Sequence, residues 1–147
     1  MAAQLGREPR GDIRVAVRCP CGLPAVVETY PLVDGVPFPT LYWLTCVRAR
    51  SAIGRLESAG RMDDLNERLE TDASFADAFD AAQRDYIARR DALCRVEGAG
   101  GVGGGPLGRI KCLHAHYAHH AVCECNPVGA WVVEQIGEVL HPPSCIE

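Results

Sequence analysis

Cysteine and histidine, the residues that most often bind metals or react as nucleophiles, are concentrated in the stretch from Lys111 to Cys125. It holds four of the five histidines and three of the eight cysteines of the chain. Imidazole nitrogen and thiolate sulfur are the usual ligands of zinc in proteins. The stretch therefore indicates a metal site or a reactive thiol, with zinc as the first choice and iron as an alternative that accepts the same donor atoms.

If the stretch is a helix, four ligand-type residues fall on one of its faces. They follow one another at i, i+4, i+7 and i+11 and are Cys112, His116, His119 and Cys123. Because eleven residues of helix extend over about 16 Å, the four side chains cannot share one ion. One ion would use His116 with Cys112, His119 or His120, and further ligands would come from other segments. In a second arrangement, Cys112 and His114 converge at the start of the helix. A helix that simply packs its histidines, without a metal, is the alternative.

The segments before this stretch predict a small sheet that could supply further ligands. Apolar patterns predict strands at 13–18, 25–30 and 41–45, with a turn or loop at 31–39, and we expect an antiparallel meander within residues 12–46. The turn after the first strand contains Cys19 and Cys21, and Cys46 follows the third strand. In such a meander these cysteines would lie at the same end of the sheet.

Helical spacing then dominates the sequence from residue 49 onward. Residues 49–97 predict three helices, of which 74–96 is the longest, and residues 98–109 form a glycine-rich loop. Residues 110–140 contain the His/Cys helix, a turn at Asn126–Gly129 and a closing helix from Ala130 to Leu140, and residues 141–147 form a loose tail. The expected fold class is α+β, with about three antiparallel strands packed against four to five helices in a single domain over residues 1–147.

The glycine-rich loop lies directly before the His/Cys helix, where it could bind an anion. Exposed backbone amides and a helix N-terminus both favour a phosphate group, and Arg109 and Lys111 would add positive charge. A phosphate-containing ligand is therefore one expectation. The loop lacks the Gly-Lys-Ser/Thr sequence of a P-loop. It is also not a dinucleotide-binding fingerprint, because a helix rather than a strand precedes it. A flexible connector is the alternative interpretation.

Composition and charge narrow the class of protein. The net charge of −4 argues against a nucleic-acid surface, and no apolar run reaches the ~18 residues of a membrane span. The first residues lack the apolar core of a signal peptide. We therefore expect a cytoplasmic protein that neither binds nucleic acid nor spans a membrane. In that compartment its cysteines should be thiols or metal ligands rather than disulfides.

Several longer motifs carry a family resemblance. They are Arg18-Cys19-Pro20 with Gly22 and Pro24, Pro37-Phe38-Pro39-Thr40-Leu41-Tyr42-Trp43-Leu44-Thr45-Cys46, Lys111-Cys112-Leu113-His114, Ala118-His119 and Asn126-Pro127-Val128-Gly129. Together they resemble the bacterial domain-of-unknown-function family 501, which is common in actinobacteria. The family has no established activity. Its genes are associated with a septum-formation gene, so the resemblance implies a connection with cell division.

The resemblance also implies a set of metal ligands. The family pattern has Cys at Cys19, Cys or His at Cys46, and Cys-Leu-His followed by Ala-His, which implies Cys19, Cys46 and Cys112 with either His119 or His114 as the fourth ligand. Cysteine and histidine replace one another as zinc ligands more readily than as core residues. The remaining candidates fall outside the pattern, and their role stays open: Cys21, His116, His120, Cys123 and Cys125. The chain departs from the family at Val47, where a proline is usual.

Three functions compete at this point. The first is a non-catalytic domain, clipped together by a closed four-ligand metal site, that binds a protein partner. The second is a metal-dependent hydrolase for a phosphate-containing substrate, with three ligands beside a cleft and Glu28, Asp34 or His114 as base. The third is a thiol-based redox protein that uses Cys112 or the Cys19-Pro20-Cys21 turn, because a helix N-terminus beside a lysine favours the thiolate.

Overall fold

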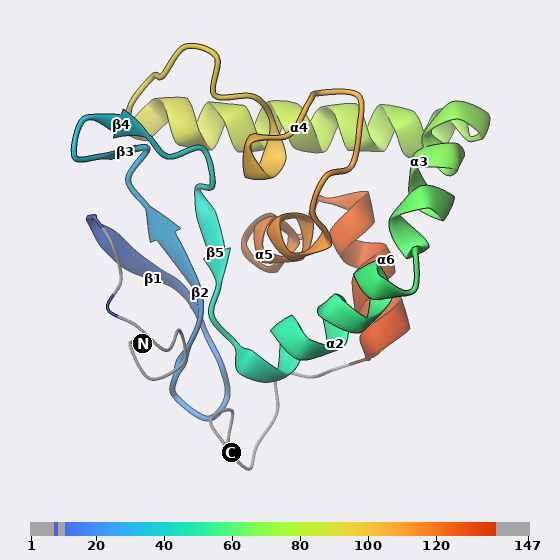
Figure 1. Cartoon of the computed structure of the whole chain (residues 1–147), viewed down its shortest axis with the longest axis horizontal. Helices are drawn as coiled ribbons and strands as arrows, with labels where there is room; N and C mark the ends of the chain where they lie inside the picture. Colours follow the sequence, from blue (N-terminus) through green and yellow to red (C-terminus); the bar gives the residue numbers. More distant parts are fainter. Residues whose placement is uncertain (1–7, 9–10, 138–147) are drawn as a thin grey trace.

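The structure is a computed structural model that describes residue 8 and residues 11–137. Within these residues, a three-stranded antiparallel sheet lies beside a group of five α-helices (Figure 1), which confirms the predicted α+β class. The predicted continuation of the closing helix to Leu140 and the tail at 141–147 lie outside the described residues. Within those residues, no helix is long and apolar enough to cross a membrane.

The sheet contains β1 (Ile13–Arg18), β2 (Pro24–Thr29) and β5 (Tyr42–Leu44), in the order β1-β2-β5. Both neighbours of β2 are antiparallel to it, so the predicted meander is present. β1 alternates between half-buried and exposed residues because only one of its faces packs against the protein. The central strand β2 is buried or half-buried along its whole length.

A short hairpin replaces part of the loop predicted at 31–39. It consists of β3 (Leu32–Val33) and β4 (Val36–Pro37). The two residues between them, Asp34 and Gly35, have φ angles of 53° and 74°. Two successive left-handed residues form the tight turn that matches the twist of a two-residue hairpin, and Asp-Gly is a preferred pair for it. The predicted turn is therefore present at Asp34-Gly35, whereas the four strand residues beside it were not predicted.

The helices are α2 (Val47–Ser58), α3 (Arg61–Thr71), α4 (Ala73–Leu93), α5 (Leu113–Cys123) and α6 (Pro127–Ile136), with a 3₁₀ turn, η1, at Val102–Gly104. Gly60, with a φ angle of 77°, separates the first two helices as predicted. Asp72 caps α4 by accepting a hydrogen bond from the backbone N–H of Phe75 at 3.1 Å.

The closing helix α6 begins three residues before its predicted start at Ala130. Asn126 caps it, because the side-chain oxygen accepts hydrogen bonds from the backbone N–H groups of Val128 (3.0 Å) and Gly129 (3.1 Å). Pro127 occupies the first helical position, which suits a residue without an N–H group. The segment predicted as a turn is therefore the cap and first turn of α6.

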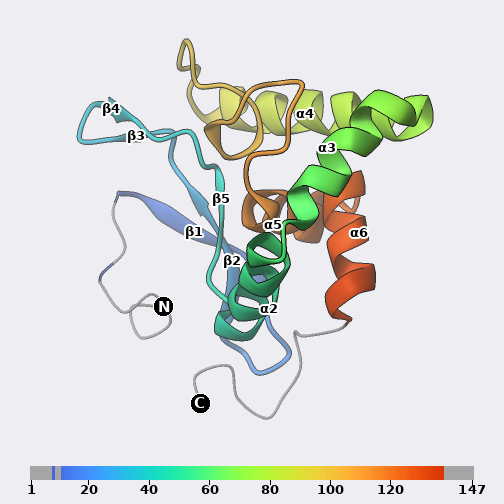
Figure 2. The same cartoon turned by 45° about the vertical axis from the view of Figure 1, so that its right-hand side comes forward.

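Helix α5 lies at the centre of the fold. In Figure 1 it is seen almost end-on, with β5, α4, α6 and α2 around it, and the turned view in Figure 2 shows the same neighbours. Six of its eleven residues are buried, namely Leu113, Ala115, His116, Tyr117, Ala118 and His119. Its two ends reach different parts of the molecule, so the Cys and His residues are divided between two environments.

Side chains of α4 hold the glycine-rich loop in place. The side-chain oxygen of Gln83 accepts a hydrogen bond from the N–H of Val102 at 2.8 Å. Its amide group donates to the carbonyl of Leu107 at 3.1 Å, and Arg90 donates to the carbonyl of Gly100 at 2.8 Å. The left-handed Gly103 consequently lies against Ala115 of α5. The loop forms a wall beside this helix, contrary to the interpretation as a flexible connector.

Candidate functional site

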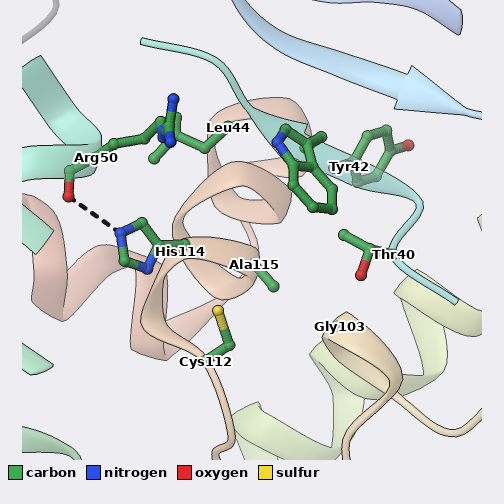
Figure 3. A pocket seen from close by; sticks show the side chains of 9 residues that line it. Thr40, Tyr42, Leu44, Arg50, Gly103, Cys112, His114 and Ala115 are labelled. Atoms are coloured by element: carbon green, nitrogen blue, oxygen red, sulfur yellow. Dashed lines mark hydrogen bonds between the residues drawn. The ribbon is translucent and has the colours of Figure 1, made fainter. Parts of the chain in front are cut away.

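A pocket of about 330 Å³ opens between β5 and the first turn of α5. It is lined by Thr40, Tyr42, Trp43, Leu44, Arg50, Gly103, Cys112, His114 and Ala115. In Figure 3, Arg50 and His114 lie on one side, Tyr42 and Thr40 lie on the other, and Cys112 lies at the base of the helix. Largely apolar walls with a few polar groups are typical of a small-molecule site.

The start of α5 positions the polar end of this pocket. Cys112 is the N-cap residue, and its extended backbone places it just before the first turn, which contains His114. Glu57, in the last turn of α2, accepts a hydrogen bond from the N–H of Leu113 at 2.8 Å. Its carboxylate therefore occupies the positive end of the α5 dipole. The same oxygen lies 3.2 Å from Nδ1 of His114.

The hydrogen bonds of His114 determine how its ring is used. Nε2 lies 3.1 Å from the backbone carbonyl oxygen of Arg50, which can only accept, so Nε2 carries a proton. Nδ1 consequently faces Glu57. The hydrogen bond with Cys112 is the main cause that raises the pKa of His114 to about 9, with further contributions from the Arg50 carbonyl and Glu57; burial acts in the opposite direction. In the absence of a metal, His114 is an imidazolium at neutral pH.

The donor atoms of Glu57, Cys112 and His114 all lie within 4.8 Å of one another. One oxygen, one sulfur and one nitrogen form a donor set that zinc accepts. Histidines that bind metals usually donate their other ring N–H to a carbonyl or carboxylate, as Nε2 of His114 does toward Arg50. The residues thus fit an ion held by three protein ligands.

A second group of donor atoms lies at the other end of α5 and consists of Asp85, His119, Cys123 and Cys125. Asn126, which is completely buried, decides the protonation of His119 in this group. Its oxygen accepts two backbone N–H groups, so its nitrogen must donate, to Nδ1 of His116 (2.9 Å) and to Nδ1 of His119 (3.1 Å).

The proton of His119 therefore sits on Nε2, which donates to Oδ2 of Asp85 at 2.8 Å. A ring nitrogen that carries a proton cannot bind a metal, and the other nitrogen is occupied by Asn126. Burial raises the pKa of Asp85, but hydrogen bonds from His119 and Arg89 outweigh it, so the pKa stays below its usual value. His119 is consequently better explained as a neutral partner of the Asp85 carboxylate than as a ligand.

A family model described as "Protein of unknown function (DUF501)" matches residues 15–134. The chain belongs to the DUF501 family. No curated protein and no solved structure matches it. Two of the stretches by which the chain resembles DUF501, residues 37–46 and 111–114, meet at the pocket beside Cys112.

The DUF501 chain does not bring the five predicted ligands together at one point within the described residues. Cys112 and His114 meet at the pocket, whereas His119 lies with Asp85. Cys19 and Cys46 are buried at the end of the sheet where β2 begins, and both lie near Tyr117. In the part of the chain that the structure describes, they belong to neither group of donor atoms.

The cysteines at the end of α5 differ from the sequence-based expectation. Cys123 and Cys125 form a disulfide, whereas thiols or metal ligands were expected. The intervening Glu124 ends the helix in the left-handed region, with a φ angle of 56°. This turn brings the two Cα atoms to 5.1 Å, which is within the range of a disulfide.

Two further histidines of α5 and the predicted anion-binding pair lie outside the pocket. Burial lowers the pKa of His116 to about 3, and Nδ1 of His120 accepts the N–H of Asn126 at 3.2 Å. Arg109 and Lys111, the predicted anion-binding pair, are exposed and do not line the pocket. The N–H of Leu113, at the helix N-terminus, binds the carboxylate of Glu57 instead.

Sequence reasoning missed Glu57 and Asp85. Glu57 reaches the site through a contact over 56 residues of sequence, and no local motif marks it. Asp85 lies in α4, within the segment predicted as the longest helix, and no motif marks it as part of a site. The only sequence signal for either was its place on a predicted helix whose packing partner was unknown.

Proposed function

We propose that the chain is a metal-dependent hydrolase whose ion is held by Cys112, His114 and Glu57 at the edge of the pocket. The observation that carries this proposal is the hydrogen bond from Nε2 of His114 to the Arg50 carbonyl. It leaves Nδ1 as the nitrogen directed toward the carboxylate of Glu57. Three ligands leave a coordination position open, which is typical of catalytic rather than structural zinc.

Each residue around the site would have a separate task. Cys112 and His114 line the pocket and would hold the ion beside a substrate. Arg50 lines the same pocket and would bind an anionic group, in keeping with a phosphate-containing substrate. Tyr42 and Trp43 would pack against its apolar part and exclude water. A bound zinc ion would supply a hydroxide nucleophile at neutral pH.

The first test is the metal content of untagged protein purified under reducing conditions. We expect about one zinc ion per chain in the wild type, because one three-ligand group fits an ion. Cys112→Ser and His114→Ala should lose it. Cys94→Ser is the matched control, because Cys94 belongs to neither group of donor atoms. Full zinc content in Cys112→Ser and His114→Ala would overturn the proposed site.

A second function is favoured by the contact between Cys112 and His114. Without a metal, Cys112 would be the nucleophile and the charged imidazole of His114 beside its sulfur would be a proton donor, with Glu57 at Nδ1 and the Arg50 carbonyl at Nε2 holding the ring. Cys112 would then react as a nucleophile with a substrate in the pocket. Zinc-free wild-type protein whose Cys112 is alkylated much faster than Cys94 would favour this function, and His114→Asn should abolish the difference. Equal alkylation rates would exclude it.

The possibility of a non-catalytic domain that binds a protein partner stays a prediction. That prediction depends on a closed metal site with four protein ligands. The four-atom group at the end of α5 contains His119, and both ring nitrogens of His119 are already hydrogen-bonded, to Asn126 and to Asp85.

A further inference from the structure

The disulfide between Cys123 and Cys125 lies at the opposite end of α5 from the pocket. Cys123 comes eleven positions after Cys112, which corresponds to about 16 Å along the helix axis. We propose that this disulfide is redox-active and exchanges with external thiols. In this exchange Cys125 is the sulfur that is attacked, and Cys123 is the sulfur that leaves. The proposal is independent of the function proposed for the pocket.

Exposure distinguishes the two cysteines. Cys125 is an exposed residue in the turn between α5 and α6, whereas Cys123, in the last turn of α5, is half-buried. A thiolate must approach along the S–S axis, so we expect it to reach the sulfur of the more exposed residue, Cys125. Glu124 between them has a left-handed backbone that residues other than glycine adopt at a cost, so opening the bond can relax the turn.

The polar groups around the disulfide also favour Cys123 as the sulfur that leaves. The backbone N–H of Cys125 donates to Sγ of Cys123 at 3.0 Å, which stabilises negative charge on a departing Cys123 thiolate. Sγ of Cys125 instead lies 3.6 Å from Oδ2 of Asp85. This carboxylate is kept ionised by His119 and Arg89, so it disfavours negative charge on Cys125 and can accept a hydrogen bond from its thiol.

The exchange balances with thiols as the only co-reactant. A thiolate forms a bond with Sγ of Cys125 while the bond to Cys123 breaks, and the electron pair goes to Sγ of Cys123, which takes a proton from water. A second thiolate attacks the external sulfur of the mixed disulfide and releases Cys125, which is then protonated. Two thiols are oxidised to one disulfide, and the protein gains two electrons and two protons. The reverse sequence oxidises the protein with a small disulfide.

The test uses the full chain, equilibrated with chelator and buffers of increasing ratio of reduced to oxidised glutathione. After an acid quench and alkylation, a protease that cleaves after glutamate separates Cys123 from Cys125, because Glu124 lies between them. Residues 98–124 and 125–134 then stay joined only through a disulfide, and fragmentation distinguishes Cys123 from Cys112 as the partner. We expect conversion from the joined to the separate peptides within this series.

The attacked sulfur is identified in the same digest at short reaction times. We expect glutathione on the peptide 125–134, which contains Cys125, and at least tenfold less on Cys123. Glutathione mainly on Cys123, or a bond that stays intact or absent in every buffer, would overturn the proposal. A second reduced sample is alkylated in the presence of zinc. If the metal protects both thiols from alkylation, the pair would be assigned to a metal site instead.

Discussion

Replacement of Asn126 should strongly destabilise the protein, because this buried side chain makes four hydrogen bonds. Two come from backbone N–H groups at the start of α6, and two go to the ring nitrogens of His116 and His119. Loss of an N-cap costs about 1 kcal/mol. Each buried acceptor left without a donor costs about 1–3 kcal/mol. Asn126→Ala should therefore lower the free energy of unfolding by about 3–7 kcal/mol.

A second variant separates the cap from the histidine network. Serine also caps helices well, so Asn126→Ser should retain the cap and lose only the two donors, at a cost of about 2–6 kcal/mol. Urea unfolding followed by circular dichroism would measure both variants, with Gln135→Ala on the exposed face of α6 as the control. A loss below about 1 kcal/mol in Asn126→Ser would refute the assigned network. Long-range ¹⁵N–¹H spectra of the wild type should show His116 and His119 protonated on Nε2.

Three further changes test the packing around α5. Gly129→Ala should destabilise the chain by about 1–3 kcal/mol, because a Cβ atom would clash with Cβ of His120, whereas Gly54→Ala, with open space around it, should be neutral or slightly stabilising. Tyr86→Phe should cost about 1–3 kcal/mol in urea unfolding, because the hydroxyl bridges the buried N–H of Leu41 and the part-buried carbonyl of Pro39 next to β5; an unchanged midpoint would contradict this. Burial lowers the pKa of His119 although Asp85 acts against it, so the unfolded chain binds more protons as the pH falls below the ordinary value of about 6.5. His119 should then contribute a fall in stability of up to about 1.4 kcal/mol per pH unit below that value, in addition to the falls from His116 and His120, whose pKa values burial also lowers. His119→Gln should therefore reduce the slope measured by unfolding at several pH values.

The fold could be predicted from the sequence wherever the signal is local. An alternating pattern predicted the first strand of the sheet and a continuous apolar run predicted the third, and glycine at position 60 separated two helices as expected. The start of α6 was missed because Asn-Pro is typical of turns as well as of helix caps, and only the bonds to Asn126 Oδ1 show that a helix follows. The hairpin at 32–37 was missed because its strands are only two residues long.

The candidate site could be predicted only in part, because only some of its contacts are local in the sequence. The convergence of Cys112 and His114 at the start of a helix is a local arrangement, and it appeared among the sequence-based alternatives. Glu57 joins them through the packing of α2 against α5, which no local pattern encodes. The separation of His119 from the pocket depends on Asn126, since its two N–H bonds fix the rings of two histidines.

The sulfur content of the metal's coordination sphere tests the central claim most directly. X-ray absorption at the zinc edge of the reduced, metal-loaded protein counts sulfur ligands at about 2.3 Å. The centre of Cys112, His114 and Glu57 predicts one sulfur, with nitrogen and oxygen in the other positions. Three sulfur ligands would support the set with Cys19 and Cys46 that the family resemblance implies, and two would support the group at Cys123 and Cys125. Either result would contradict the metal centre proposed for the pocket.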